Sequence, residues 1–359
     1  MSLKRLLLSL VAVIIISVSE VSANCPNGRC GSQGTICPTD TSLFCSLCSD
    51  PRLCTFSEER ARIDLLGNFL FSQFFYKEQN SPLKGANVTV VAETSRRNGR
   101  IFVSGLQLRI ILYCENEFSY VFLNLATQLI DGQVVLSVSD LLGQTSDFIY
   151  NNTHIVLKKL ASCCILSLVT TPDYFYVINI ECFDIKIGIR PVESGLAPCI
   201  FVEVGNPSLV QFPPFNDWPS QLCLTNEFGI ADLTQSCKLE SPTDALNFLA
   251  LTGVTDLNAN ITHQPQNVVQ LGELVNECPR ESLETFLGYL AFIQDHNLVN
   301  CISGEGNEEA LINLAIAIAE IFCNGDQDKC SVVNGILENE CSSVSDTILH
   351  TFYSEQCSF

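Results

Sequence analysis

Six cysteines crowd into thirty residues near the start of the chain, in the stretch CPNGRCGSQGTICPTDTSLFCSLCSDPRLC (residues 25–54). A zinc site would need a second ligand pair and reduced thiolates, and a redox pair at Cys45 and Cys48 would have to open a helix after a strand. The proline and glycine residues between these cysteines favour turns and leave little core, so cross-links must replace burial. The stretch therefore predicts a small module with three disulfide bonds, formed by Cys25, Cys30, Cys37, Cys45, Cys48 and Cys54.

The first residues of the chain indicate the compartment in which such bonds form. Lys4 and Arg5 precede an apolar run, residues 6–18, that is too short to span a bilayer, and small residues follow it at 21–23. We expect a signal peptide over residues 1–23, a secreted and extracellular protein, and oxidised cysteines. No later apolar stretch is long enough to span a membrane, so no membrane span is expected.

Thirteen further cysteines divide into two groups along the chain. Seven lie between residues 114 and 237, and six lie in the last third. If pairing stays within each region, the last six form bridges among themselves and one cysteine of the middle group is left over. Such a residue would be buried and inert or would link two chains into a disulfide-bonded oligomer. The six are Cys278, Cys301, Cys323, Cys330, Cys341 and Cys357.

Hydrophobic periodicity divides the rest of the chain into regions. Apolar residues at helical spacing over 57–76 predict a leading helix, and β-branched and aromatic runs then predict strands near 87–94, 101–113, 118–130, 133–142, 154–160, 163–171, 174–183 and 185–192. Asn98-Gly99 predicts a tight hairpin turn between the first two. A proline-rich stretch follows over 205–240. Residues 241–244 then give a helix start signal, and helical patterns follow near 267–278, 280–296, 307–323, 329–341 and 343–356.

These patterns predict a multidomain α+β protein. We expect a cysteine-rich module over residues 24–55 and a β-rich domain with its leading helix over 56–204, built as an antiparallel sandwich or barrel. A proline-rich connection over 205–240 would lead to an acidic helical domain over 241–359, a bundle cross-linked by disulfides between helix ends.

The charge of the chain restricts its partners. The formal net charge is −20, and residues 231–359 hold 19 acidic residues against three basic ones, a net of −16. Such a region repels phosphate backbones, which argues against nucleic-acid binding and favours basic proteins, cations or mineral surfaces.

Three further groups of residues are candidates for binding or modification. Sequons at Asn87, Asn151 and Asn260 predict N-linked glycans. Arg96, Arg97 and Arg100 surround the predicted hairpin turn and form a candidate docking site for glycans, or an exposed turn without a ligand. Asp326 and Asp328 are candidate calcium ligands, although two carboxylates fall short of the six to eight oxygens that calcium takes.

No catalytic motif is found in the sequence. The four histidines do not stand at metal-binding intervals, no GxSxG elbow occurs, and no catalytic residue or cofactor is assigned. The sequence therefore favours a secreted, non-catalytic acidic glycoprotein of the matrix or cell surface that acts through contacts with extracellular proteins or glycans. Two alternatives stay open: a carrier of an apolar ligand, and a calcium- or mineral-associated matrix component.

Overall fold

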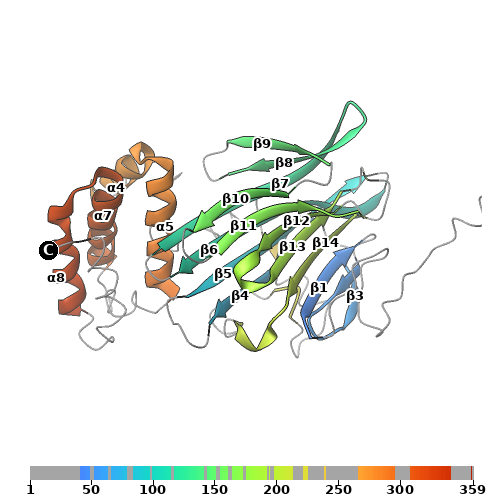
Figure 1. Cartoon of the computed structure of the whole chain (residues 1–359), viewed down its shortest axis with the longest axis horizontal. Helices are drawn as coiled ribbons and strands as arrows, with labels where there is room; N and C mark the ends of the chain where they lie inside the picture. The colour runs from blue at the N-terminus through green and yellow to red at the C-terminus, as the bar shows by residue number, and fades with distance from the viewer. Residues whose placement is uncertain are drawn as a thin grey trace, which may run out of the picture.

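The computed structural model describes residues 41–48, 52–63, 66–78, 84–97, 99–114, 117–140, 144–150, 154–160, 164–172, 175–191, 194, 198–212, 221–224, 238–239, 266–295, 308–340 and 357. These residues form two antiparallel β-sheets that pack face to face, with helices covering one sheet from outside (Figure 1).

The first sheet, sheet A, has the strand order β10-β11-β12-β13-β14-β1-β2-β3. Its middle strands follow one another in the chain, but β1 comes from the start of the described chain and pairs in full with β14, from Leu43 opposite Val204 to Cys48 opposite Cys199. The strands are β1 (Leu43–Cys48), β2 (Arg52–Cys54), β3 (Arg60–Arg62), β10 (His154–Leu160), β11 (Cys164–Thr170), β12 (Tyr176–Ile180), β13 (Ile185–Arg190) and β14 (Cys199–Val204).

The second sheet, sheet B, has the order β15-β4-β5-β6-β7-β8-β9, and a further strand, β16, also pairs with β4. Its central strands are long, and Gly99 between β5 and β6 has the positive φ of 78° that a tight hairpin turn requires. The strands are β4 (Gly67–Lys77), β5 (Lys84–Arg97), β6 (Arg100–Cys114), β7 (Glu117–Ile130), β8 (Gln133–Ser139), β9 (Thr145–Ile149), β15 (Val210–Gln211) and β16 (Lys238–Leu239).

The main core lies between the two sheets. Alternate residues of the strands point into it, as the period of two requires, for example Val88 and Val90 of β5 and Leu108 and Ile110 of β6. Ile178 and other inward side chains of sheet A complete the same cluster. The space between the sheets is therefore filled by side chains.

One helix packs directly on the outer face of sheet B, against β6 and β7, and the other three lie behind it and pack on one another. This face presents apolar and aromatic side chains such as Ile111 and Phe118, which share a core with the helices. Gly288 of α5 lets the helix approach so closely that a Cβ there would lie 2.8 Å from the backbone nitrogen of Ser119. The helices are α4 (Gln266–Glu277), α5 (Arg280–Asp295), α7 (Glu308–Asn324) and α8 (Cys330–Glu340).

The predicted fold class is wrong. The described chain is mainly antiparallel β, and its four α-helices share one core with the outer face of sheet B, on which α5 packs directly, so they do not form a separate helical bundle. The leading helix expected over 57–76 is also wrong: β3 and β4 occupy this stretch, and Glu58 before them has a left-handed φ of 67°. Strand pairing with β5 overrides the helical periodicity here.

Disulfide bonds cross the predicted domain boundaries. Cys45 bonds to Cys223 and Cys48 bonds to Cys199, so the prediction that the cysteines of residues 25–54 pair among themselves is wrong for these two. Both lie on β1 at the centre of sheet A, where pairing brings distant segments together. Other bridges are local and join Cys164 to Cys182, Cys278 to Cys323 and Cys330 to Cys357.

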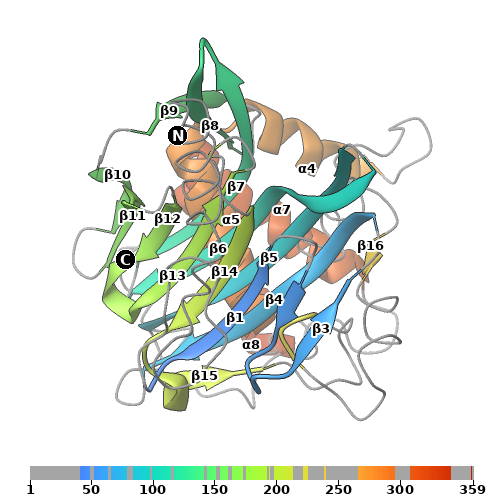
Figure 2. The same cartoon turned by 90° about the vertical axis from the view of Figure 1, so that its right-hand side faces the viewer.

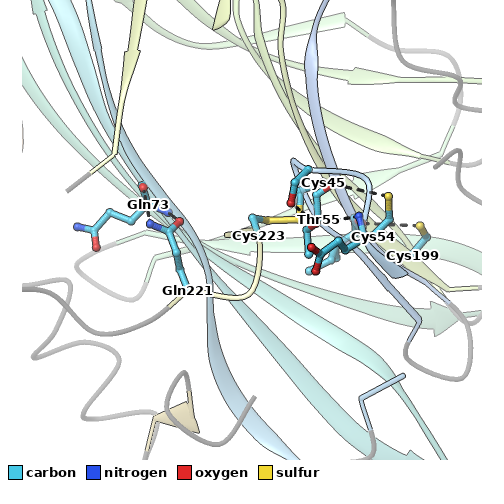
Figure 3. The surroundings of a disulfide bond; sticks show 10 residues. Cys45, Cys54, Thr55, Gln73, Cys199, Gln221 and Cys223 are labelled. Atoms are coloured by element: carbon cyan, nitrogen blue, oxygen red, sulfur yellow. Dashed lines mark hydrogen bonds between the residues drawn. A yellow bond between two sulfur atoms is a disulfide. The ribbon is translucent and has the colours of Figure 1, made fainter. Parts of the chain in front are cut away.

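The proline-rich connection is packed where the structure describes it. Gln221 exchanges hydrogen bonds with the backbone of Gln73 at 2.7 and 3.0 Å, and Leu222 and Cys223 donate to carbonyls of β4 (Figure 3). The Cys45–Cys223 bond then joins this segment to β1, so the segment ties sheet B to sheet A.

Candidate functional site

The hairpin strands β7, β8 and β9 form an arm that projects from the sandwich (Figures 1 and 2). At its tip Asp131 and Gly132 adopt positive φ angles of 50° and 77°, which make the tight turn between β7 and β8. Near its root, hydrogen bonds connect the three strands from Gln128 Nε2 to Ser137 Oγ at 2.8 Å and from Ser137 Oγ to Asp147 Oδ1 at 2.5 Å. The arm is thus a braced element rather than an irregular loop.

Large apolar side chains are exposed on and beside this arm. Leu129 is 56% exposed, Ile130 40%, Ile149 49% and Val156 on the neighbouring strand β10 50%. These are four of the six large hydrophobic side chains exposed among the described residues. Exposed apolar side chains scattered singly are normal, whereas their concentration on one projecting element indicates an interaction surface.

A pocket of about 290 Å³ lies at the root of the arm; we call it the side pocket. Strands β7, β8 and β9 of sheet B, β10 of sheet A and the start of α5 surround it. Most of its wall is apolar, formed by Phe122, Leu123, Phe148, Ile155, Leu157 and Leu283. The strand ends and the helix meet here, and their side chains do not fill the space between them.

Charged side chains from three elements meet at the rim of the side pocket. Lys158 Nζ of β10 lies 2.5 Å from Glu284 Oε2 of α5, and Arg280 lies 2.9 Å from Asp140 Oδ2 and 3.3 Å from Glu284 Oε1. Arg280 also donates to Gln144 Oε1 at 3.1 Å. These contacts join α5 to both sheets, and each charge at the rim has an opposite charge beside it.

Tyr120 lines the side pocket and is buried in the core shared with the helices. Burial raises the pKa of this phenol, and the positive charge of Arg109 partly opposes the shift. The shift favours the neutral phenol in the folded protein.

The predicted arginine cluster forms a hairpin end, as expected from its turn residues. The register places Arg97 opposite Arg100 and Arg96 opposite Ile101, and the side chains of Arg96 and Arg100 are exposed. Glycan docking at this turn stays a prediction.

The predicted glycosylation sites fall in different places. Asn87 lies in the middle of β5 opposite Phe75 and Ile111, and its side chain is 0% exposed, so this position leaves no room for a glycan in the folded protein. Asn151 and Asn260 lie outside the residues that the structure describes, and their glycosylation stays a prediction.

The candidate calcium ligands lie in the turn between α7 and α8. Asp326 Oδ1 accepts the backbone N–H of Asp328 at 3.2 Å, and the neighbouring Lys329 pairs with Glu320 at 2.9 Å. Within the described part of the chain no group of three or more His, Cys, Asp or Glu side chains could hold a metal ion. The calcium role of these two residues is not supported by their contacts.

All twelve cysteines that the structure describes are disulfide-bonded, among them Cys54 and Cys114. A cysteine left over for a bond to another chain is therefore not among these twelve. The other seven lie outside the described residues: Cys25, Cys30, Cys37, Cys163, Cys237, Cys301 and Cys341.

Sequence reasoning missed the side pocket and the apolar surface of the arm. The wall residues come from five separate elements, and no motif connects them along the chain. A weak signal was present in QLIDG, where two large apolar residues directly precede a turn. Models of known protein families and curated proteins were also compared with this chain, and none matches.

Proposed function

We propose that the protein is a secreted, non-catalytic acidic glycoprotein of the cell surface or matrix that binds an extracellular partner through its β7–β9 arm. The observation that carries this proposal is the exposure of Leu129, Ile130 and Ile149 on one projecting, hydrogen-bonded element. Burying such side chains against a partner contributes a favourable free energy of roughly 25 cal/mol per Å² of apolar surface removed from water.

The disulfide pattern supports the extracellular part of this proposal. Bridges connect β1 of sheet A to the segment 221–224, which is hydrogen-bonded to β4, and hold α7 to the end of α4, so the cysteines stabilise the fold. Such bonds persist in oxidising compartments. No helix within the described ranges is long and apolar enough to cross a membrane.

The arm can be tested by changing its exposed residues. We expect the double variant Leu129→Asp and Ile130→Asp to fold and to be secreted, because both side chains are exposed, but to lose its retention on the producing cells and their matrix. Val332→Asp is the matched control, because Val332 is also exposed, at 45%, but lies on α8. The measurement is the ratio of protein in matrix and cell-surface fractions to protein in the medium.

Two results would contradict the proposal. Equal retention of the arm variant and the wild type would show that the arm makes no such contact. Loss of retention in the α8 control as well would assign the effect to added negative charge rather than to the arm.

A further inference from the structure

We propose that the side pocket binds a small, neutral molecule with an apolar, flat or short-chain body and one hydrogen-bonding group. This site is independent of the partner contact proposed for the tip of the arm, since the two use different side chains. The inference follows from the size of the pocket, the nature of its wall and the balance of charge at its rim.

The size of the pocket limits the ligand. The pocket has a volume of about 290 Å³. Small-molecule sites in proteins start near this volume, at about 300 Å³. A ligand with one or two fused rings, or a chain of similar bulk, would fill it, whereas a long acyl chain or a folded peptide would not.

The wall of the pocket favours an apolar body. The rings of Phe122 and Phe148 and the aliphatic side chains of Ile155, Leu157 and Leu283 line it. Water against this apolar part of the wall lacks hydrogen-bond partners there, so its replacement by an apolar ligand is favourable. Flat aromatic molecules also gain from offset or edge-to-face contacts with the two phenylalanine rings.

The rim of the pocket favours a neutral ligand. Two cations, Lys158 and Arg280, face two carboxylates, Asp140 and Glu284, and each lies within 3.3 Å of an opposite charge. Because these charges neutralise one another, an anionic or cationic ligand would have to break a partly buried ion pair to be recognised. A neutral ligand needs only one hydrogen bond, for which the hydroxyl-bearing Ser146 stands at the rim.

The mouth of the pocket is open to solvent. Val156 and the side chain of Arg280, both at the rim, are about half exposed, at 50% and 48%. Ser146 on the edge strand β9 is exposed as well and lines the pocket. A ligand can therefore enter beside β9 and β10 without opening the core between the sheets.

Ser146→Phe is the variant that tests this site. The new ring would occupy the pocket from an exposed position on an edge strand, so the core between the sheets stays intact. Thr145→Phe is the matched control: Thr145 is the neighbouring exposed residue of β9, alternation along the strand points it to the opposite face, and it does not line the pocket.

The probe is prodan, a neutral naphthalene fluorophore whose emission shifts to the blue in apolar surroundings. We expect saturable, one-site binding to the wild type and to Thr145→Phe, and binding weaker by at least about tenfold in Ser146→Phe, because the filled pocket leaves no space for the rings. An anionic naphthalene sulfonate should bind at least about tenfold more weakly than prodan to the wild type, since it must displace a paired charge.

The outcomes separate this inference from the proposal for the arm. Absence of saturable prodan binding to the wild type, or equal binding to Ser146→Phe, would overturn it. Tighter binding of the anionic probe than of prodan would contradict the inference that the ligand is neutral. The variant Leu129→Asp with Ile130→Asp should bind prodan like the wild type, so loss of partner contact and loss of the ligand site can be told apart.

Discussion

Tyr176 connects the two sheets through a single hydroxyl group. Its ring is fully buried in the core, and its Oη donates toward the carbonyl oxygens of Val134 at 3.1 Å and Phe148 at 3.4 Å. Burial, and to a smaller degree the charge that Tyr150 acquires at high pH, raise the pKa of Tyr176 to about 12. The neutral phenol is therefore the form that the folded protein stabilises.

This shift gives a prediction of pH dependence. A raised pKa contributes stability that is fully present below the unfolded value of 10.0 and is lost as the pH rises toward about 12. Tyr176→Phe should cost about 1 kcal/mol at pH 7, through the lost hydrogen bond, and should show a smaller fall in stability between pH 10 and 12. Urea unfolding across this range measures both effects. Parallel curves for variant and wild type would contradict the prediction.

At the scale of elements, the position of α5 against sheet B depends on the absence of a side chain at Gly288. Alanine normally stabilises a helix interior by about 1 kcal/mol relative to glycine. Here the added Cβ would lie 2.8 Å from Ser119 N and 3.1 Å from the carbonyl carbon of Phe118, backbone atoms of β7 that cannot move aside cheaply. Close contact with the strand therefore outweighs helix propensity.

Gly335 of α8 allows a matched comparison. No atom lies within 4 Å of a Cβ at this position. We expect Gly335→Ala to raise the free energy of unfolding by about 0.5–1 kcal/mol, and Gly288→Ala to lower it by about 1–2 kcal/mol because of overpacking. Urea unfolding measures the sign of each change in the free energy of unfolding. Faster amide hydrogen exchange in α5 of Gly288→Ala would show that the destabilisation lies in this helix. Stabilisation by Gly288→Ala would show that α5 does not pack as closely as described.

Strand β4 shows why one element was predicted as a helix. Phe69, Phe71, Phe74 and Tyr76 point into the core between the sheets, at intervals of two, three and two residues. The interval of three arises at a β-bulge between Leu70 and Ser72, where the register against β5 shifts by one residue. A bulge thus breaks the period of two, and the resulting spacing resembles that of a helix.

At the scale of the whole molecule, two disulfides close nearly the same loop. Cys45–Cys223 spans 178 residues and Cys48–Cys199 spans 151. With either bridge intact, the other closes only a short remaining loop, so the stabilisation that each provides depends on the other.

This coupling predicts non-additive effects of cysteine substitution. Replacing either pair by serine should lower the free energy of unfolding by about 3–4 kcal/mol, and removing the second pair should then cost about 5 kcal/mol, because the full loop opens. Replacing Cys278 and Cys323, whose bridge spans 45 residues within the helices, should add independently to either. Urea unfolding of the single-pair, double-pair and combined variants measures these terms. Equal and additive costs for the two long bridges would contradict the prediction.

The local structure of this protein was largely readable from its sequence. The eight strands predicted between residues 87 and 192 occur in the structure, as do the positive φ of Gly99 between the first two of them and the four helices predicted between 267 and 341. Hydrophobic periodicity, turn residues and helix-forming stretches depend on a few neighbouring residues, so they can be recognised directly in the amino-acid sequence. The oxidised state of the cysteines likewise followed from their number and setting.

Only the tertiary structure decided how these elements are joined. The insertion of β1 between β14 and β2, the packing of the helices on sheet B and the bonding of Cys45 to Cys223 each depend on contacts between residues far apart in the chain. The side pocket exists because five elements meet without filling the space between them. Such packing leaves no local pattern in the sequence. The hydrophobic period of one strand or helix would allow it to pack against many other elements equally well.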